Sequence, residues 1–231
     1  MKWLYLSIDF FTVIIPFLFS FHPKLQFHKH FSAFFFANAL VGLVFVIWDI
    51  YFTQQGVWGF NEQYLSGIYV YNLPIEEVLF FICIPYACVF TYHCLGLFYT
   101  LQWNLKYLHT LIICLIVFFA IVGFMHLDKY YTASTFISLA IVLFIFHFRL
   151  KKPYLGKLII IYPILLIPFF IVNGVLTGSG LPQPVVWYND TENLGLRLFT
   201  IPVEDVFYGF ELILLNIYLF EYVKPKQVVM S

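Results

Sequence analysis

The sequence predicts an all-α protein that crosses a membrane about seven times, and three observations favour this class. The chain has 231 residues, 62% of them hydrophobic and 10% charged, whereas soluble domains are usually about a quarter charged. The apolar residues fall in runs of roughly 20, which is enough for one helix to cross a bilayer. A pair of acidic residues also recurs in matching surroundings, which indicates two related halves.

Each apolar run is predicted to form one membrane-spanning helix. The expected bounds are residues 3–20, 31–52, 75–98, 107–125, 131–150, 158–176 and 202–222. The first run is expected to be a span rather than a signal peptide, because Asp9 interrupts it, Pro16 lies inside it and no small-residue cleavage site follows. Two long segments between spans, about 53–73 and 177–201, are of the kind that often covers a functional site.

The distribution of Lys and Arg predicts the orientation in the membrane. One side carries Lys24, Lys29, Lys106, Arg149, Lys151, Lys152, Lys157, Lys224 and Lys226. The other side carries Lys2, Lys129 and Arg197. We therefore expect a multi-pass protein of the cell (inner) membrane, with its N-terminus outside and its C-terminus in the cytoplasm. The formal net charge of +0 gives no electrostatic reason to expect nucleic acid as a partner.

An internal repeat relates the third span to the seventh. A shift of 128 residues matches Gly67 with Gly195, Pro74 with Pro202, Glu76 with Glu204 and Glu77 with Asp205. A shift of 124 residues matches Asp49 with Asn173, Thr53 with Thr177 and Gly56 with Gly180, and one short indel then brings Trp58 to Trp187. The expected organisation is a first three-helix repeat (1–100), a connector helix (101–128) and a second, parallel three-helix repeat (129–231).

The paired acids are the main functional candidates. A single pair after a proline could simply begin a helix, where the helix dipole favours acidic side chains. The pair occurs twice between apolar neighbours, however, and ionisable groups inside a membrane are costly and usually functional. The predicted catalytic residues are Glu76, Glu77, Glu204, Asp205 and, in support, Asp49.

The aromatic content, 23% of the chain, suggests a cavity for an apolar substrate and aromatic faces for a cationic intermediate. The predicted substrate-binding residues are Phe80, Phe81, Trp48, Trp58, Tyr208 and Glu211. Glu211 is expected on the same helical face as Glu204, and its counterpart in the first half is Cys83, so the two halves are expected to differ inside.

No metal or organic cofactor is expected. Of the seven histidines only His28 and His30 are close in sequence, and two residues apart they do not share a helix face. The seventh span has no lysine before Lys224 that could hold retinal, and no Gly-x-Gly-x-x-Gly motif for a dinucleotide is present. Carboxylic acids without these groups suggest proton transfer.

Several motifs carry a resemblance to a known family. They are Pro74-Ile75-Glu76-Glu77 with Phe80-Phe81, the upstream Trp48-Asp49 and Trp58-x-Phe60-Asn61, and Pro202-Val203-Glu204-Asp205 in the second half. Together they resemble the small integral-membrane lycopene cyclases in the fused form known from archaea and fungi, over essentially the whole chain. The resemblance implies an isomerase of carotenoid biosynthesis that converts lycopene through γ-carotene to β-carotene, by protonation, ring closure and proton removal, without a redox cofactor.

Other functions fit some of the same features. A carotenoid hydratase or an ε-cyclase would use the same protonation step and differ in product. A small proton-coupled transporter would also use intramembrane acids and repeats. A third alternative is a structural subunit that binds carotenoid without reacting with it. Lycopene and other apolar carotenoids, together with membrane lipid, are the expected partners, and a homo-oligomer is compatible with the sequence.

Overall fold

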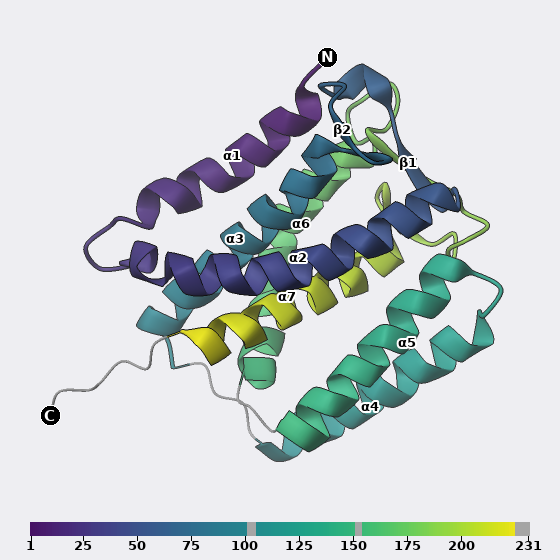
Figure 1. Cartoon of the computed structure of the whole chain (residues 1–231). Coiled ribbons are helices and arrows are strands. Elements are labelled where there is room, and N and C mark those ends of the chain that lie inside the picture. Colours follow the sequence, from purple (N-terminus) through teal and green to yellow (C-terminus); the bar gives the residue numbers. More distant parts are fainter. Residues whose placement is uncertain (101–104, 151–153, 225–231) are drawn as a thin grey trace, which may run out of the picture.

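The structure, a computed structural model, describes residues 1–100, 105–150 and 154–224, and seven α-helices run through these residues (Figure 1). The helices are α1 (Leu4–Phe19), α2 (Phe31–Gln54), α3 (Ile75–Phe98), α4 (Leu105–Met125), α5 (Tyr130–Phe144), α6 (Tyr154–Leu176) and α7 (Val203–Val223). Short 3-10 turns lie at η1 (Phe27–His30) and η2 (Glu62–Tyr64), and a π-helical segment, η3 (Ile145–Leu150), continues α5. The predicted all-α class is confirmed. Lys151, Lys152 and Lys226, used for the expected orientation, lie outside the described residues.

Six of the described helices, α2 to α7, are long and apolar enough to cross a membrane, so the chain is a multi-pass membrane protein. The helix α1 is shorter than these six. Its 16 residues extend about 24 Å, against a hydrocarbon core about 30 Å thick. The prolines that precede α3 and α7, Pro74 and Pro202, suit a helix start because the missing N–H would have no partner there.

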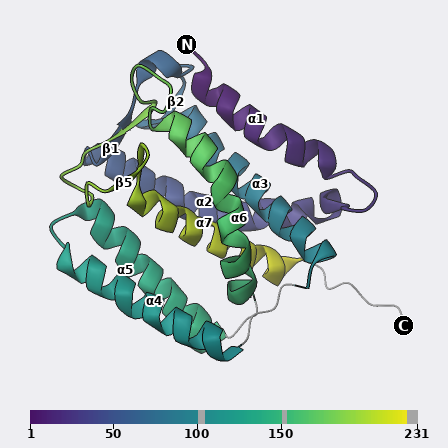
Figure 2. The ribbon, with the colours of Figure 1, turned by 180° about the vertical axis from the view of Figure 1, so that it is seen from behind.

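The two halves have the same architecture. In the first half α1 packs on α3, and in the second α5 packs on α7, while α2 and α7 join the halves along their length (Figures 1 and 2). The predicted connector, α4, lies at the side of the bundle against α5. The exact division at residues 100 and 128 stays a prediction.

Short strands between the spans make the repeat visible in detail. Antiparallel pairs join β1 (Trp58–Phe60) to β4 (Val186–Tyr188), β2 (Tyr69–Val70) to β3 (Leu73–Pro74) and β5 (Arg197–Leu198) to β6 (Ile201–Pro202). The pair β1–β4 crosses from one half to the other, with Gly59 opposite Trp187. A Cβ atom on Gly59 would lie 2.3 Å from the Trp187 ring, so any larger residue there would require that ring to move.

The hydrogen bonds beside this ribbon correct one predicted match. The N–H of Asn61 donates to the carbonyl of Val185, and the N–H of Asn189 donates to the carbonyl of Val57, both over 2.8 Å. These bonds are related by the same 128-residue shift as the helices. Trp58 therefore corresponds to Val186, and the expected match with Trp187 is off by one residue, because the indel falls before β4. Trp58 is buried, whereas 44% of Trp187 is exposed.

Candidate active site

The acidic pair at the start of α3 separates into two roles. Glu76 and Glu77 are adjacent, so their side chains leave the helix about 100° apart. The buried Oε1 of Glu76 accepts a hydrogen bond from the backbone N–H of Ser66 over 2.6 Å. Glu77 instead lines a cavity of about 670 Å³. Glu76 thus holds the preceding loop to the helix start, and Glu77 faces the space where a ligand can bind.

The pair at the start of α7 separates in the same way. Oε1 of Glu204 accepts hydrogen bonds from the backbone N–H of Leu194, over 2.7 Å, and from the Thr132 hydroxyl, over 2.6 Å. Asp205 lines the cavity, and Leu194 and Ser66 are related by the 128-residue shift. Of the four paired acids, the structure therefore brings Glu77 and Asp205 to the cavity and keeps Glu76 and Glu204 outside its lining.

Phenol groups donate hydrogen bonds to two of the cavity carboxyl groups, those of Glu77 and Asp205. The Tyr5 hydroxyl donates to Oε2 of Glu77 over 2.6 Å. Asp205 accepts from two phenols, with Tyr131 donating to Oδ1 over 2.5 Å and Tyr188 to Oδ2 over 2.9 Å. Burial, and then the nearby carboxylate of Asp205, raise the pKa of the Tyr188 phenol well above its ordinary value, so this group stays a proton-bearing donor.

Asp49 gives the first half a second cavity carboxyl group. It lies near the end of α2 and accepts hydrogen bonds from the Trp58 indole N–H and, over 3.2 Å, from the Thr53 hydroxyl. Its carboxyl group lies beside that of Glu77, which lines the same cavity. Two carboxyl groups can form a hydrogen bond to each other only when a proton lies between them. The matching residue of the second half, Asn173, lines the cavity as an amide.

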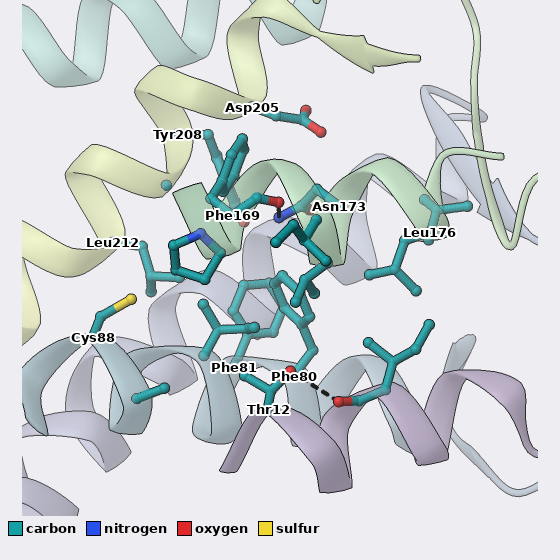
Figure 3. A pocket seen from close by; sticks show the side chains of 18 of the residues that line it. Thr12, Phe80, Phe81, Cys88, Phe169, Asn173, Leu176, Asp205, Tyr208 and Leu212 are labelled. Atoms are coloured by element: carbon teal, nitrogen blue, oxygen red, sulfur yellow. Dashed lines mark hydrogen bonds between the residues drawn. The ribbon is translucent and has the colours of Figure 1, made fainter. Parts of the chain in front are cut away.

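Aromatic side chains form much of the cavity wall. Phe80 and Phe81 of α3, Phe169 of α6 and Tyr208 of α7 converge on the cavity, and Asp205 lies one helical turn before Tyr208 (Figure 3). Trp58 also lines the cavity, with its ring centroid 6.4 Å from that of Tyr208. The Tyr208 hydroxyl is buried and has no hydrogen-bond partner among the described residues. Aromatic faces of this kind stabilise a nearby cation.

Two predicted substrate-binding residues lie outside the cavity lining. Trp48 packs behind Tyr208, with the ring centroids 5.2 Å apart. Glu211 faces α5, where it accepts a hydrogen bond from the Ser138 hydroxyl over 2.8 Å. Phe80, Phe81, Trp58 and Tyr208, which were predicted with them, all line the cavity. Among the described residues, no group of three or more His, Cys, Asp and Glu side chains is arranged to hold a metal ion.

The phenol donors were not among the site residues predicted from the sequence. Tyr5 and Tyr131 lie near the starts of α1 and α5, and each donates to the cavity carboxylate of its own half. A shift of 126 residues relates them, and it also relates Asp9 to Thr135, so each tyrosine precedes a polar residue by four positions. The repeat thus extends to the first helix of each half, and this match is the signal that points to the two tyrosines.

The fold and the site define a class of protein. It is a membrane-embedded protein in which carboxyl groups from two repeats face one apolar, aromatic cavity. The family model described as lycopene cyclase matches residues 2–95 and 128–223, which together make up most of the chain and one region in each half. The chain belongs to the lycopene cyclase family. No curated protein and no solved structure matches it.

Proposed function

We propose that the protein is a lycopene β-cyclase, which closes the linear ends of lycopene to β-rings with no net redox change. The observation that carries the proposal is that Asp49, Glu77 and Asp205, drawn from both halves, face one apolar cavity. The reaction needs an acid and a base at opposite stages of one ring closure. An apolar polyene matches the mostly apolar wall.

In the proposed reaction the Asp49–Glu77 pair is the proton donor. A proton held by this pair adds to the terminal double bond of the substrate, and a tertiary carbocation results. The neighbouring double bond then supplies the electron pair for the new carbon–carbon bond and closes a six-membered ring. The positive charge moves to a ring carbon, where Trp58 and Tyr208 can stabilise it by about 0.5–2 kcal/mol for each aromatic face.

Asp205 is the proposed base. Its two phenol donors stabilise the ionised carboxylate, since hydrogen bonds to a charged acceptor are among the stronger ones. Removal of the proton from the ring carbon next to the cation forms the ring double bond of a β-ring. One proton is taken up and one released, so the product is an isomer of the substrate. For the next turnover, the proton must return to the Asp49–Glu77 pair.

The orientation in the membrane is part of the proposal. The strand-bearing ends of the helices, which hold the three cavity carboxyl groups, would lie at the outer side of the cell membrane (Figure 1). The Lys- and Arg-rich ends would lie in the cytoplasm, with the N-terminus outside. Cysteine labelling of Asp128→Cys at the turn after α4, compared with Lys24→Cys, tests this orientation.

Pigment analysis tests the function. Expression of this chain in a host that accumulates lycopene should produce γ-carotene and then β-carotene, measured by chromatography. Hydroxylated products would identify a hydratase, and ε-ring products an ε-cyclase. Unchanged lycopene, with the protein shown to be inserted in the membrane, would rule out the proposed reaction on this substrate.

A further inference from the structure

The cavity opens toward the lipid-facing surface. Phe11 and Ile15 of α1 and Ile171 of α6 line it, yet 69%, 62% and 66% of these side chains are exposed. Side chains that both line a cavity and lie exposed on the outside of a bundle mark its mouth. We call these three residues the lateral mouth. Ile171 lies in α6, which is long and apolar enough to cross a membrane, and Phe11 and Ile15 lie in the shorter apolar helix α1, so we expect the mouth to face acyl chains rather than water.

The carboxyl groups occupy one end of this cavity. Asp49, Glu77 and Asp205 lie at the end where the strands are, whereas Thr91 lines the opposite end. Glu77 and Thr91 are fourteen residues apart on α3, which corresponds to about 21 Å along the helix. Among the described residues that line the cavity, only Asp49, Glu77 and Asp205 carry a carboxyl group. Proton transfer by carboxyl groups is therefore confined to one end of the cavity.

The matching space in the other half is filled. The repeat relates Phe169, Val172 and Phe80, which line the open cavity, to Phe45, Trp48 and Tyr208. The ring centroids of these last three residues lie close together, with Phe45–Tyr208 at 5.0 Å and Trp48–Tyr208 at 5.2 Å. Ring packing therefore closes the space between α2 and α7, while the space between α6 and α3 stays open.

We propose that a linear carotenoid reaches the carboxyl groups sideways from the bilayer, through the lateral mouth, and that its two ends react in separate visits. This inference rests on the proposed cyclase function. With the acids at one end of the cavity, only the end of the chain beside them can form a ring. The chain must then withdraw through the mouth and return with its other end first. The monocyclic intermediate is therefore released into the lipid between the two ring closures.

Isotope dilution tests the release of the intermediate. The full-length protein is placed in lipid vesicles that contain isotopically labelled lycopene and an excess of unlabelled monocyclic carotenoid. We expect labelled monocyclic product to accumulate, and the first dicyclic product to carry mostly unlabelled carbon. Dicyclic product with undiluted label would overturn the inference and leave the cyclase function intact. Absence of any cyclised product would instead overturn the cyclase function itself.

Two matched pairs of variants test the route. Ile171→Trp and Ile15→Trp place a bulky ring at the mouth, and we expect each to slow both ring closures roughly ten-fold. Their controls, Ile47→Trp and Ile141→Trp, change the repeat-related residues, which are 57% and 54% exposed but do not line the cavity. We expect the controls to keep the parental rate. Equal slowing within each pair would overturn the lateral route.

Discussion

The two halves of the molecule share a scaffold but differ in the chemistry that they contribute. Both hold the loop before the last helix with a buried glutamate, through the bonds Ser66–Glu76 and Leu194–Glu204. At the cavity, however, the first half supplies two carboxyl groups and the second supplies one, because Asn173 stands in the place of Asp49. The loop-holding glutamates are thus alike in the two halves, whereas the matched cavity residues Asp49 and Asn173 differ. The two repeats therefore contribute unequal sets of carboxyl groups to one cavity.

The largest expected effect follows removal of either proposed proton-transfer group. Glu77→Gln and Asp205→Asn should each lower the rate of ring closure by about 10²–10⁴-fold, the usual range for general acid–base catalysis. The measurement is pigment formation per inserted protein in a lycopene-accumulating host. Asp128→Asn, at an exposed acid in the turn after α4, is the control and should remain fully active. If only one of the two variants loses activity, the site does not draw its acid and base from different halves.

A smaller effect is expected when the first half is made more like the second. Asp49→Asn removes the carboxyl partner that is proposed to share a proton with Glu77, but keeps an amide oxygen able to accept from Trp58 and Thr53. We expect a loss of roughly ten- to a hundred-fold, because Glu77 then holds the proton without its partner. Initial rates of monocyclic product formation measure this. A rate equal to that of the parent protein would show that Glu77 works without a carboxyl partner.

Removing one phenol hydroxyl group from each half compares the roles of Glu77 and Asp205. Tyr131→Phe deletes a donor to Asp205, and Tyr5→Phe deletes the donor to Glu77. Hydrogen bonds to charged groups contribute about 1.5–3 kcal/mol, so the loss at Asp205 should slow ring closure at least about ten-fold. Tyr5→Phe should cost less, since a protonated acid depends less on an external donor. The reverse order would exchange the assignments of acid and base, and Tyr64→Phe in the adjoining core serves as a control for packing.

The smallest effect on the rate of ring closure is expected from changes to Glu76 and Glu204, the two glutamates that hold the loops. Glu76→Gln and Glu204→Gln should lower the free energy of unfolding by about 1–3 kcal/mol, because each changes a buried side chain that accepts a hydrogen bond from the preceding loop. Activity per folded molecule should stay near the parental value. Thermal unfolding in detergent measures the first quantity and pigment formation the second, with the exposed Glu62→Gln as control. Loss of activity in stably folded Glu76→Gln would place that residue in the chemistry.

The length of the apolar runs and the hydrophobic composition were sufficient to predict the all-α membrane class, because a membrane-spanning helix is encoded in one local stretch of sequence. The repeat also located the carboxyl groups at the correct ends of α3 and α7. The split between Glu76 and Glu77 could not be predicted, because it depends on how the helix is rotated against its neighbours. The sequence likewise could not show that Glu211 faces Ser138 rather than the cavity. The direction of each of these side chains depends on tertiary packing, which the repeat pattern does not describe.

The ribbon formed by β1 and β4 affects which halves can pair with each other. Gly59 and Trp187 are partners in the ribbon, and they are also equivalent positions in the two repeats. A ribbon between two second halves would set indole against indole, where the present fit requires a glycine. One between two first halves would set glycine against glycine and leave the indole-sized space empty. The close fit of an indole against a glycine is therefore available only between unlike halves.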